Sequence, residues 1–184
     1  MFMKKFILLL YTCAVLTSCA DKPFVIIQIA DAQLGFDAAV KGQAPDAEYV
    51  NDLTYETEFL KQAVQKVNAL KADAVVFTGD QVNKPEDALQ WDTFADAISE
   101  IDSQTSVFHI PGNHDVLLSE GKVDITPFSS RYGEDRFVYS DNQVCIVGIN
   151  SNLIKSNDPR EEEQFEWMRS VLEAAGNHVV NLVF

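Results

Sequence analysis

Three short apolar runs, each followed by polar residues, constrain the fold of this 184-residue chain more than any other feature. They cover residues 25–30, 74–78 and 106–110, and stretches long enough for a helix separate them. The second run is apolar throughout, which is typical of a strand covered on both faces of its sheet. Strands joined through helices pair in parallel. The spacing therefore predicts an α/β fold whose first half is a largely parallel sheet with helices on the outside.

Helical periodicity is visible in both connections. In residues 54–71, apolar side chains recur every three or four positions, at Leu60, Val64 and Val67. A second helix is expected to open at Pro85, because proline is favoured in the first helical turn. Its apolar positions are Leu89, Phe94, Ala97 and Ile101.

The second half of the chain departs from this alternation. Residues 116–134 show no period and are expected to form an irregular loop. Two apolar runs, 137–139 and 144–149, flank a polar turn and predict a β-hairpin. A helix at 162–175, with Trp167, Val171 and Leu172 on one face, and a last strand at 178–184 complete a single domain.

The polar residues after the three apolar runs predict a shared metal site. Ligand sites in open α/β sheets are built at the carboxyl ends of the strands, and carboxylate and amide oxygens suit hard divalent ions. One such residue alone is usually a turn or a helix cap, but three strand ends in order favour one site. The candidate ligands are Asp31 and Gln33 after the first run, Asp80 after the second and Asn113 after the third. Asn83 is a supporting residue, and His114 and Asp115 are the candidate catalytic residues.

The residue types at these strand ends indicate phosphoester chemistry. A carboxylate has two oxygens, so a single Asp can bridge a pair of ions, which would polarise a phosphoryl oxygen and activate a shared water. Gly79 and Gly112 precede the candidate ligands and allow the backbone to approach the site closely. His114 is a candidate either to stabilise the leaving oxygen or to protonate it, and Asp115 is expected to orient its imidazole.

The N-terminal residues predict export and lipid anchoring. Lys4 and Lys5 precede an apolar segment that is shorter than the roughly 20 residues of a membrane span, as in a secretory signal peptide. Leu16-Thr17-Ser18-Cys19 resembles the bacterial lipobox, in which cleavage precedes an acylated cysteine. The expected organisation is a signal peptide over 1–18, a lipidated tether over 19–23 and a catalytic domain over 24–184. The alternative is ordinary secretory cleavage near this position. If Cys19 is lipidated, the protein is expected in the bacterial cell envelope, outside the cytoplasm.

Charge and the remaining cysteine and histidine residues limit other functions. The formal charge is −14, and −16 without residues 1–18, so a nucleic acid is not expected as a partner. Cys145 lies in an apolar run and is expected to be a small buried residue. His109 lies within a strand and His178 begins one, so both are expected to be packing residues. The acidic run 161–163 is expected to be the exposed start of a helix.

The chain resembles the calcineurin-like metallophosphoesterase superfamily, whose fold is a sandwich of layered β-sheets flanked by helices. Gly79-Asp80-Gln81-Val82-Asn83 matches the second of its ordered motifs, and Gly112-Asn113-His114-Asp115 matches the third in full. The resemblance implies two divalent ions, drawn from Mn, Fe, Mg and Zn. It implies Asp31 on one ion, Asp80 between them, Asn113 on the other and His114 as proton donor. The expected reaction is hydrolysis of phosphomonoesters or phosphodiesters through a metal-bridged hydroxide.

Two departures from the superfamily pattern affect this expectation. Gln33 stands where the superfamily usually has histidine, and residues 31–35 resemble instead a subgroup with Asp-Pro-Gln-Phe-Gly. That subgroup includes animal proteins described as serine/threonine phosphatases. The two last histidine-bearing motifs do not occur, so the domain is expected to be a C-terminally truncated fragment with little or no activity. The alternative is an envelope-anchored binding module that keeps the fold without catalysis and uses the acidic loop 31–52 for recognition.

Arg131 and Arg136 are candidates to clamp a phosphate, although exposed loop arginines are usually only solvated.

Overall fold

The computed structural model describes residues 22–41, 52–175 and 180–184. The predicted signal peptide, Cys19, part of the acidic loop and His178 lie outside these ranges. The elements in chain order are β1 (Ile26–Ile29), α1 (Phe36–Lys41), α2 (Thr54–Leu70), β2 (Ala74–Phe77), α3 (Ala88–Ile98), β3 (Ser106–His109), β4 (Leu117–Ser119), β5 (Lys122–Asp124), α4 (Thr126–Tyr132), β6 (Phe137–Ser140), β7 (Val144–Gly148), the 3₁₀ turn η1 (Ser151–Leu153), α5 (Arg160–Ala175) and β8 (Val180–Val183).

Two three-stranded sheets form the centre of the molecule. The first has the order β1-β2-β3 and is wholly parallel, as predicted. The second has the order β6-β7-β8; β7 pairs antiparallel with β6, which confirms the predicted hairpin, and parallel with β8. Both central strands, β2 and β7, are buried at every position because each is covered on both faces.

Alternate side chains of β2 enter two different cores, since successive residues of a strand face opposite sides. Ala74 and Val76 pack between the two sheets, together with Ile146 of β7. Val75 and Phe77 pack on the other side, in the core beneath the helices. β2 therefore joins both halves of the hydrophobic interior.

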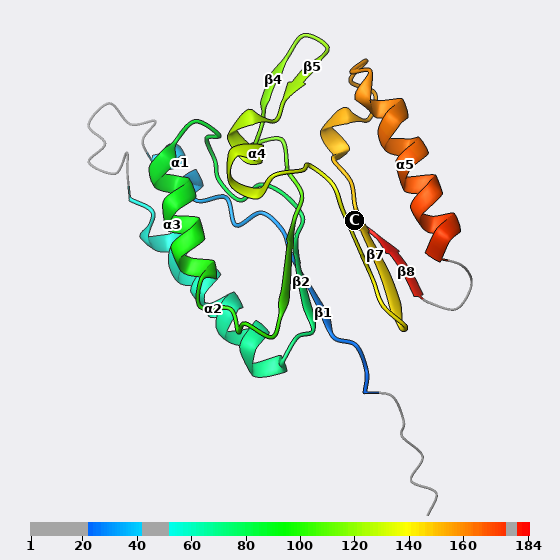
Figure 1. Cartoon of the computed structure of the whole chain (residues 1–184). Coiled ribbons are helices and arrows are strands. Elements are labelled where there is room, and N and C mark those ends of the chain that lie inside the picture. The colour runs from blue at the N-terminus through cyan, green and yellow to red at the C-terminus, as the bar shows by residue number, and fades with distance from the viewer. Residues whose placement is uncertain (1–21, 42–51, 176–179) are drawn as a thin grey trace, which may run out of the picture.

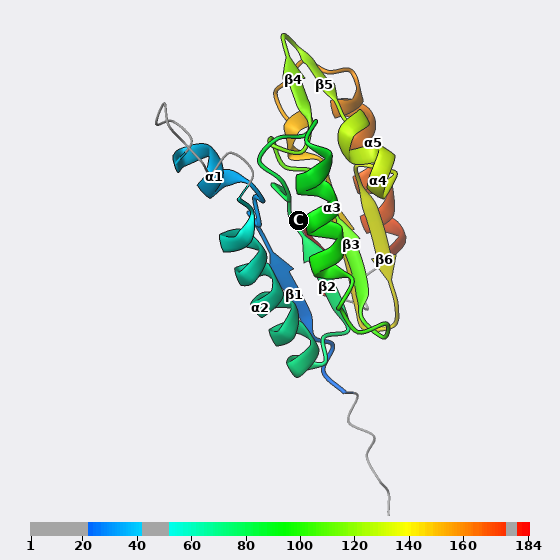
Figure 2. The ribbon, with the colours of Figure 1, turned by 90° about the vertical axis from the view of Figure 1, so that its left-hand side faces the viewer.

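Helices cover the outer faces of the two sheets. α2 and α3 lie side by side over the β1-β2-β3 sheet, and α5 lies beside β7 and β8 on the opposite side of the molecule (Figures 1 and 2). Leu60, Val64 and Val67 form the buried face of α2, as its periodicity predicted. The order helix, sheet, sheet, helix confirms the predicted α/β sandwich.

Three local predictions were wrong. Helix α3 begins at Ala88 rather than at Pro85, with Asp87 as its N-cap, and Leu89 is exposed rather than buried. Residues 116–134 are not an irregular loop, since they form the hairpin β4–β5 and the helix α4. The segment after β1 is also not all loop, because it contains the short helix α1.

The carboxyl ends of β1, β2 and β3 face the end of the molecule that also carries α1, α4 and the β4–β5 hairpin (Figures 1 and 2). Across the described ranges, no helix combines the length and apolar character needed to cross a membrane.

Candidate functional site

The loops after β1 and β2 run side by side beyond the paired strands. The backbone N–H of Gln33 donates to the carbonyl oxygen of Asp80 at 2.7 Å. Further along the same two loops, Leu34 and Val82 form an isolated parallel β-bridge. Asp31 and Gln33 are therefore held next to Asp80, as the strand-end pattern predicted.

The loop after β3 packs directly against the Asp80 carboxylate. The backbone N–H of His114 donates to Asp80 Oδ1 at 2.9 Å. A Cβ at Gly112 would overlap Asp80 Oδ1 and lie 2.8 Å from Asp80 Cγ. A Cβ at Gly79 would lie 2.6 Å from both Cα and N of Gly112. Glycine is required at both positions because the second and third loops meet without space for a side chain.

Three of the four candidate metal ligands have a left-handed backbone. The φ angle is 54° at Asp31, 43° at Gln33 and 50° at Asp80. This conformation costs about 1–2 kcal/mol for a residue other than glycine, and it persists only where surrounding contacts enforce it. The hydrogen bonds between the loops supply those contacts, so the site is held in a strained, preorganised form.

One ring nitrogen of His114 contacts the backbone of the second loop, and the other ring nitrogen does not. Its Nδ1 lies 2.9 Å from the carbonyl oxygen of Asn83. A carbonyl oxygen can only accept, so Nδ1 carries the proton and Nε2 is left for a ligand. The predicted role of Asp115 in orienting this imidazole is not what the structure shows, because the Asn83 carbonyl occupies that position.

Asp115 instead joins the second and third loops from beneath. It is fully buried. Its Oδ1 accepts the N–H groups of Gln81 and Val82 at 2.9 and 3.2 Å, and its Oδ2 accepts the N–H of Gly112 at 2.8 Å. Burial raises the pKa of Asp115 to about 7 against the opposing effect of these N–H donors, and the nearby Asp80 carboxylate adds to the rise. The residue supports the site and does not face a substrate.

Gln81 and Asn152 also support the site, and sequence reasoning missed both roles. Gln81 Nε2 donates to the carbonyl oxygen of Ile110 at 3.0 Å, and Asn152 Nδ2 donates to that of Gly112 at 3.1 Å. Asn150 caps the 3₁₀ turn that carries Asn152. Both asparagines follow the apolar run of β7, so the pattern of polar residues after an apolar strand extends to a fourth strand end.

The other sequence candidates have packing roles. The His109 ring stacks on Tyr132 at 3.9 Å and on Phe77 at 5.0 Å between centroids, which confirms it as a packing residue. The Arg131 guanidinium lies 5.0 Å from the centre of the Trp91 ring, and Arg136 pairs with Glu163 at 2.6 Å. Cys145 is buried and free, as predicted.

The candidate ligands bring only oxygen to a metal. Two are carboxylates, Asp31 and Asp80, and two are amides, Gln33 and Asn113. Within the described part of the chain, no group of three or more His, Cys, Asp or Glu side chains lies close enough to hold an ion. This donor set fits a hard ion such as Mg or Mn and suits softer ions poorly.

The fold and the site define a layered α/β protein with candidate oxygen ligands at the carboxyl ends of a parallel sheet. The sequence matches the family described as calcineurin-like phosphoesterase over residues 24–182, and the chain belongs to this family. It is 28% identical over 164 residues to a serine/threonine-protein phosphatase, CPPED1 of Bos taurus, an alignment that covers 84% of this chain and 52% of the relative. The chain thus spans about half the length of that curated relative.

Two solved structures share the fold. The purple acid phosphatase PPD1 from yellow lupin (Lupinus luteus) seeds superposes with a TM-score of 0.58 at 16% identity, over 86% of this chain and 29% of that one. A dimetal phosphatase from Danio rerio superposes with a TM-score of 0.53 at 16% identity, over 88% of this chain and 70% of that one. At these identities the likeness shows the layered fold alone.

Proposed function

We propose that this chain carries a metal-dependent phosphoesterase site that hydrolyses phosphomonoesters or phosphodiesters. The observation that carries the proposal is the convergence of three strand-end loops on one residue, Asp80. The first loop bonds to the Asp80 backbone, and the third donates the His114 N–H to the Asp80 side chain. Family membership supports the same reaction class.

Each candidate residue has a defined role in this proposal. Asp31, Gln33 and Asp80 would hold one divalent ion, and Asp80 and Asn113 a second. Bound divalent ions polarise a phosphoryl oxygen and make water nucleophilic near neutral pH. Asn83 fixes the His114 ring through Nδ1–H, so Nε2 faces the site and, in the imidazolium form, can donate a proton to the leaving oxygen.

Metal binding provides the first test. We expect the chain to bind Mn²⁺ in calorimetry and the Asp80→Asn variant to lose that binding, because the shared carboxylate becomes a neutral amide. Asp96→Asn is the matched control, since Asp96 is exposed on α3, away from the three loops. Equal Mn²⁺ content in the wild type and the Asp80→Asn variant would contradict the proposed bridging role of Asp80.

Turnover of an aryl phosphate with Mn²⁺ provides the second test. We expect slow hydrolysis, because only two of the four candidate ligands are charged. His114→Gln should reduce the rate by about a hundredfold, as loss of a general acid does, while Mn²⁺ content stays unchanged. Hydrolysis that is fast and insensitive to His114→Gln would contradict the assignment.

A non-catalytic binding module is the second candidate function. The scarcity of charged ligands favours it, since no group of three His, Cys, Asp or Glu side chains forms a metal cluster in the described ranges. Mn²⁺ binding without detectable hydrolysis would identify this alternative.

We further propose that Cys19 carries a lipid anchor that holds the protein in the bacterial cell envelope, on the basis of Leu16-Thr17-Ser18-Cys19. Stable attachment takes more than one acyl chain, as the lipobox modification would supply. Cys19→Ala should move the protein from the membrane fraction to the soluble fraction; an unchanged distribution would contradict the anchor.

A further inference from the structure

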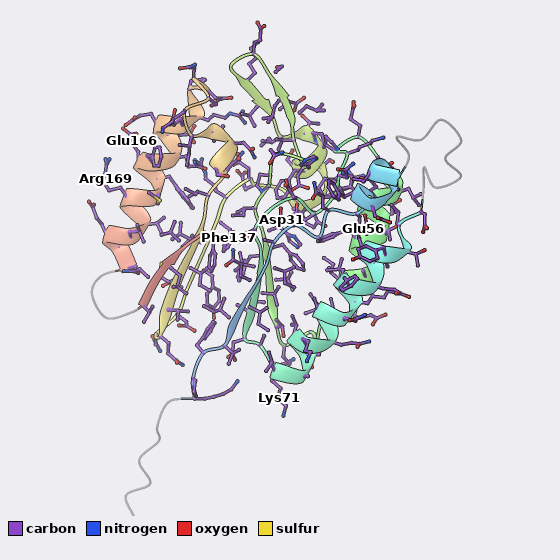
Figure 3. All side chains as sticks on the ribbon, turned by 180° about the vertical axis from the view of Figure 1, so that it is seen from behind. Asp31, Glu56, Lys71, Phe137, Glu166 and Arg169 are labelled. Carbon is purple, nitrogen blue, oxygen red and sulfur yellow. The ribbon has the colours of Figure 1, made fainter. Side chains whose placement is uncertain are left out.

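A pocket of about 330 Å³ lies between the carboxyl end of β1 and the first turns of α2. Asp31 lines one side, and Tyr55, Glu56 and Phe59 line the other. Figure 3 shows Asp31 at the end of β1 and Glu56 near the start of α2. The volume is at the low end of the roughly 300–1,000 Å³ of ligand pockets, which fits a small ligand or one end of a larger one.

Glu56 has a carboxylate oxygen that the fold does not use. The side chain is only 9% exposed. Its Oε1 accepts the N–H of Asp37 at 2.6 Å and so ties α1 to α2. Its Oε2 is buried and has no hydrogen-bond partner among the described residues. The structural contact uses one oxygen, so hydrogen-bond donors of the described residues offset the negative charge of this pocket-lining carboxylate only in part.

Aromatic rings form the outer wall of the pocket. Tyr55 and Phe59 lie one turn apart on α2, with ring centroids 4.9 Å apart. Their side chains are 58% and 56% exposed. Of the described residues that line the pocket, two are acidic and none is basic. Aromatic faces attract cations, so carboxylate and rings together complement a positive charge with apolar substituents.

A metal ion fits this pocket poorly. Hard divalent ions take six or more oxygen ligands, whereas the carboxylates that line this pocket are Asp31 and Glu56, and Glu56 Oε1 already accepts the Asp37 N–H. We propose that the pocket formed by Tyr55, Glu56 and Phe59 binds an organic ammonium group.

Asp31 connects this pocket to the candidate metal site, because it lines the pocket and follows β1 beside Asp80. A phosphoester of an amino alcohol would place its phosphoryl group at Asp80 and its ammonium group against Glu56. This extension to the substrate rests on the function proposed above, whereas ammonium binding itself does not.

Choline is the probe, and its neutral carbon isostere is the matched ligand. Each is titrated into the metal-free chain and followed by calorimetry and by shifts in side-chain NMR signals. We expect saturable binding of choline and roughly tenfold weaker binding of the isostere, which keeps the shape but lacks the charge. Absence of saturable choline binding, or equal affinity for both ligands, would overturn the proposal.

Substitutions on α2 test whether choline binds in this pocket. Glu56→Gln keeps an oxygen for the Asp37 N–H and should weaken choline binding by roughly tenfold. Glu58→Gln removes the same charge from an exposed position on the same helix and should leave the affinity unchanged. Phe59→Ala alters only an exposed ring and should also weaken binding. Equal losses in Glu56→Gln and Glu58→Gln would indicate general charge attraction and reject the pocket.

These measurements use neither metal nor phosphoester. Failure of choline binding therefore leaves the Mn²⁺ and aryl phosphate tests intact, and failure of those tests leaves the ammonium pocket intact.

Discussion

Gly112 and Asp80 show why single residues control the candidate site. The Asp80 carboxylate lies against the Gly112 backbone, in space that any side chain at Gly112 would occupy. Asp80 itself has a φ of 50°, so its position is maintained by neighbours rather than by its own preference. A small change at either residue is therefore expected to alter the geometry of the candidate ligands.

The first prediction concerns Gly112→Ala. We expect this variant to lose Mn²⁺ binding and to have a lower free energy of unfolding, because the new methyl group would overlap both Asp80 Oδ1 and the Asp80 backbone nitrogen. Gly133→Ala is the control: Gly133 has a φ of 80° but open space at its Cβ position. It should lower the free energy of unfolding and leave Mn²⁺ affinity unchanged. The interpretation fails if both variants bind Mn²⁺ like wild type in calorimetry.

The second prediction concerns the pH dependence of stability through His109. Burial lowers the pKa of this imidazole from 6.5 to about 3. Between these values the unfolded chain binds a proton that the folded chain excludes, so stability falls as the pH drops below 6.5. The slope is at most about 1.4 kcal/mol per pH unit.

His109→Phe isolates this effect because it retains an aromatic ring against Phe77 and Tyr132. Urea unfolding of both proteins across this pH range should show the variant gaining stability relative to wild type as the pH falls from 6.5 toward about 3. A constant difference across the range would show that His109 does not titrate in this way.

At the scale of elements, helix α3 shows how a capping residue outweighs a proline. Proline is favoured in a first helical turn, yet the helix begins three residues after Pro85, where the Asp87 side chain accepts the N–H groups of Leu89 and Gln90. Pro85 has a different role, since its carbonyl oxygen accepts Trp91 Nε1–H at 2.8 Å. Both residues are compatible with a helix start, and tertiary contacts selected one.

The third prediction tests this helix start. Asp87→Ala should lower the free energy of unfolding by about 1 kcal/mol, as loss of an N-cap does. Asp92→Ala, on the exposed face of the same helix, should change it by less than about 0.5 kcal/mol. Equal effects in urea unfolding would argue against Asp87 as the cap.

Elements of three residues were beyond sequence prediction. β4 and β5 each contain three residues, which is too short for an alternating pattern to be distinguished from chance. Asp158 contributes to holding this hairpin, because its carboxylate accepts the Val123 N–H at 3.3 Å. Arg160 holds the pKa of Asp158 well below its usual range. Such a contact, 35 residues apart in the chain, has no local signature.

At the scale of the whole molecule, packing between the two sheets determines cooperativity. Phe108 of β3 stacks on Phe137 of β6 with centroids 4.6 Å apart. Gly148 permits this contact, because a Cβ there would overlap the Phe137 ring. The first and second halves of the chain therefore share one core and are expected to unfold together.

The fourth prediction tests the shared core. Ile146 is fully buried between the sheets, so Ile146→Ala should lower the free energy of unfolding by about 2–5 kcal/mol. Val138→Ala, at a position 45% exposed in the same hairpin, is the control and should have a much smaller effect. Circular dichroism and tryptophan fluorescence should report one coincident transition. Separate transitions would show that the two sheets fold independently.

Local residue patterns predicted the six strands of the two larger sheets, the helices α2 and α5 and the meeting of the first three strand-end loops. Apolar periodicity and polar strand ends are short-range properties, and parallel pairing brings such ends to one edge of a sheet. This is why Asp31, Asp80 and Asn113 could be grouped before the fold was known.

Tertiary structure alone decided which partner each group meets. The apolar faces of β2 and β7 mark them as buried, but their packing against each other depends on contacts about 70 residues apart, as between Val76 and Ile146. In the same way, Asn83 rather than the adjacent Asp115 supports His114, because chain folding places a distant carbonyl on the ring while Asp115 turns inward. Sequence determined the kinds of groups at the site, and three-dimensional packing determined their pairing, because hydrogen-bond partners and core contacts depend on distance in space rather than along the chain.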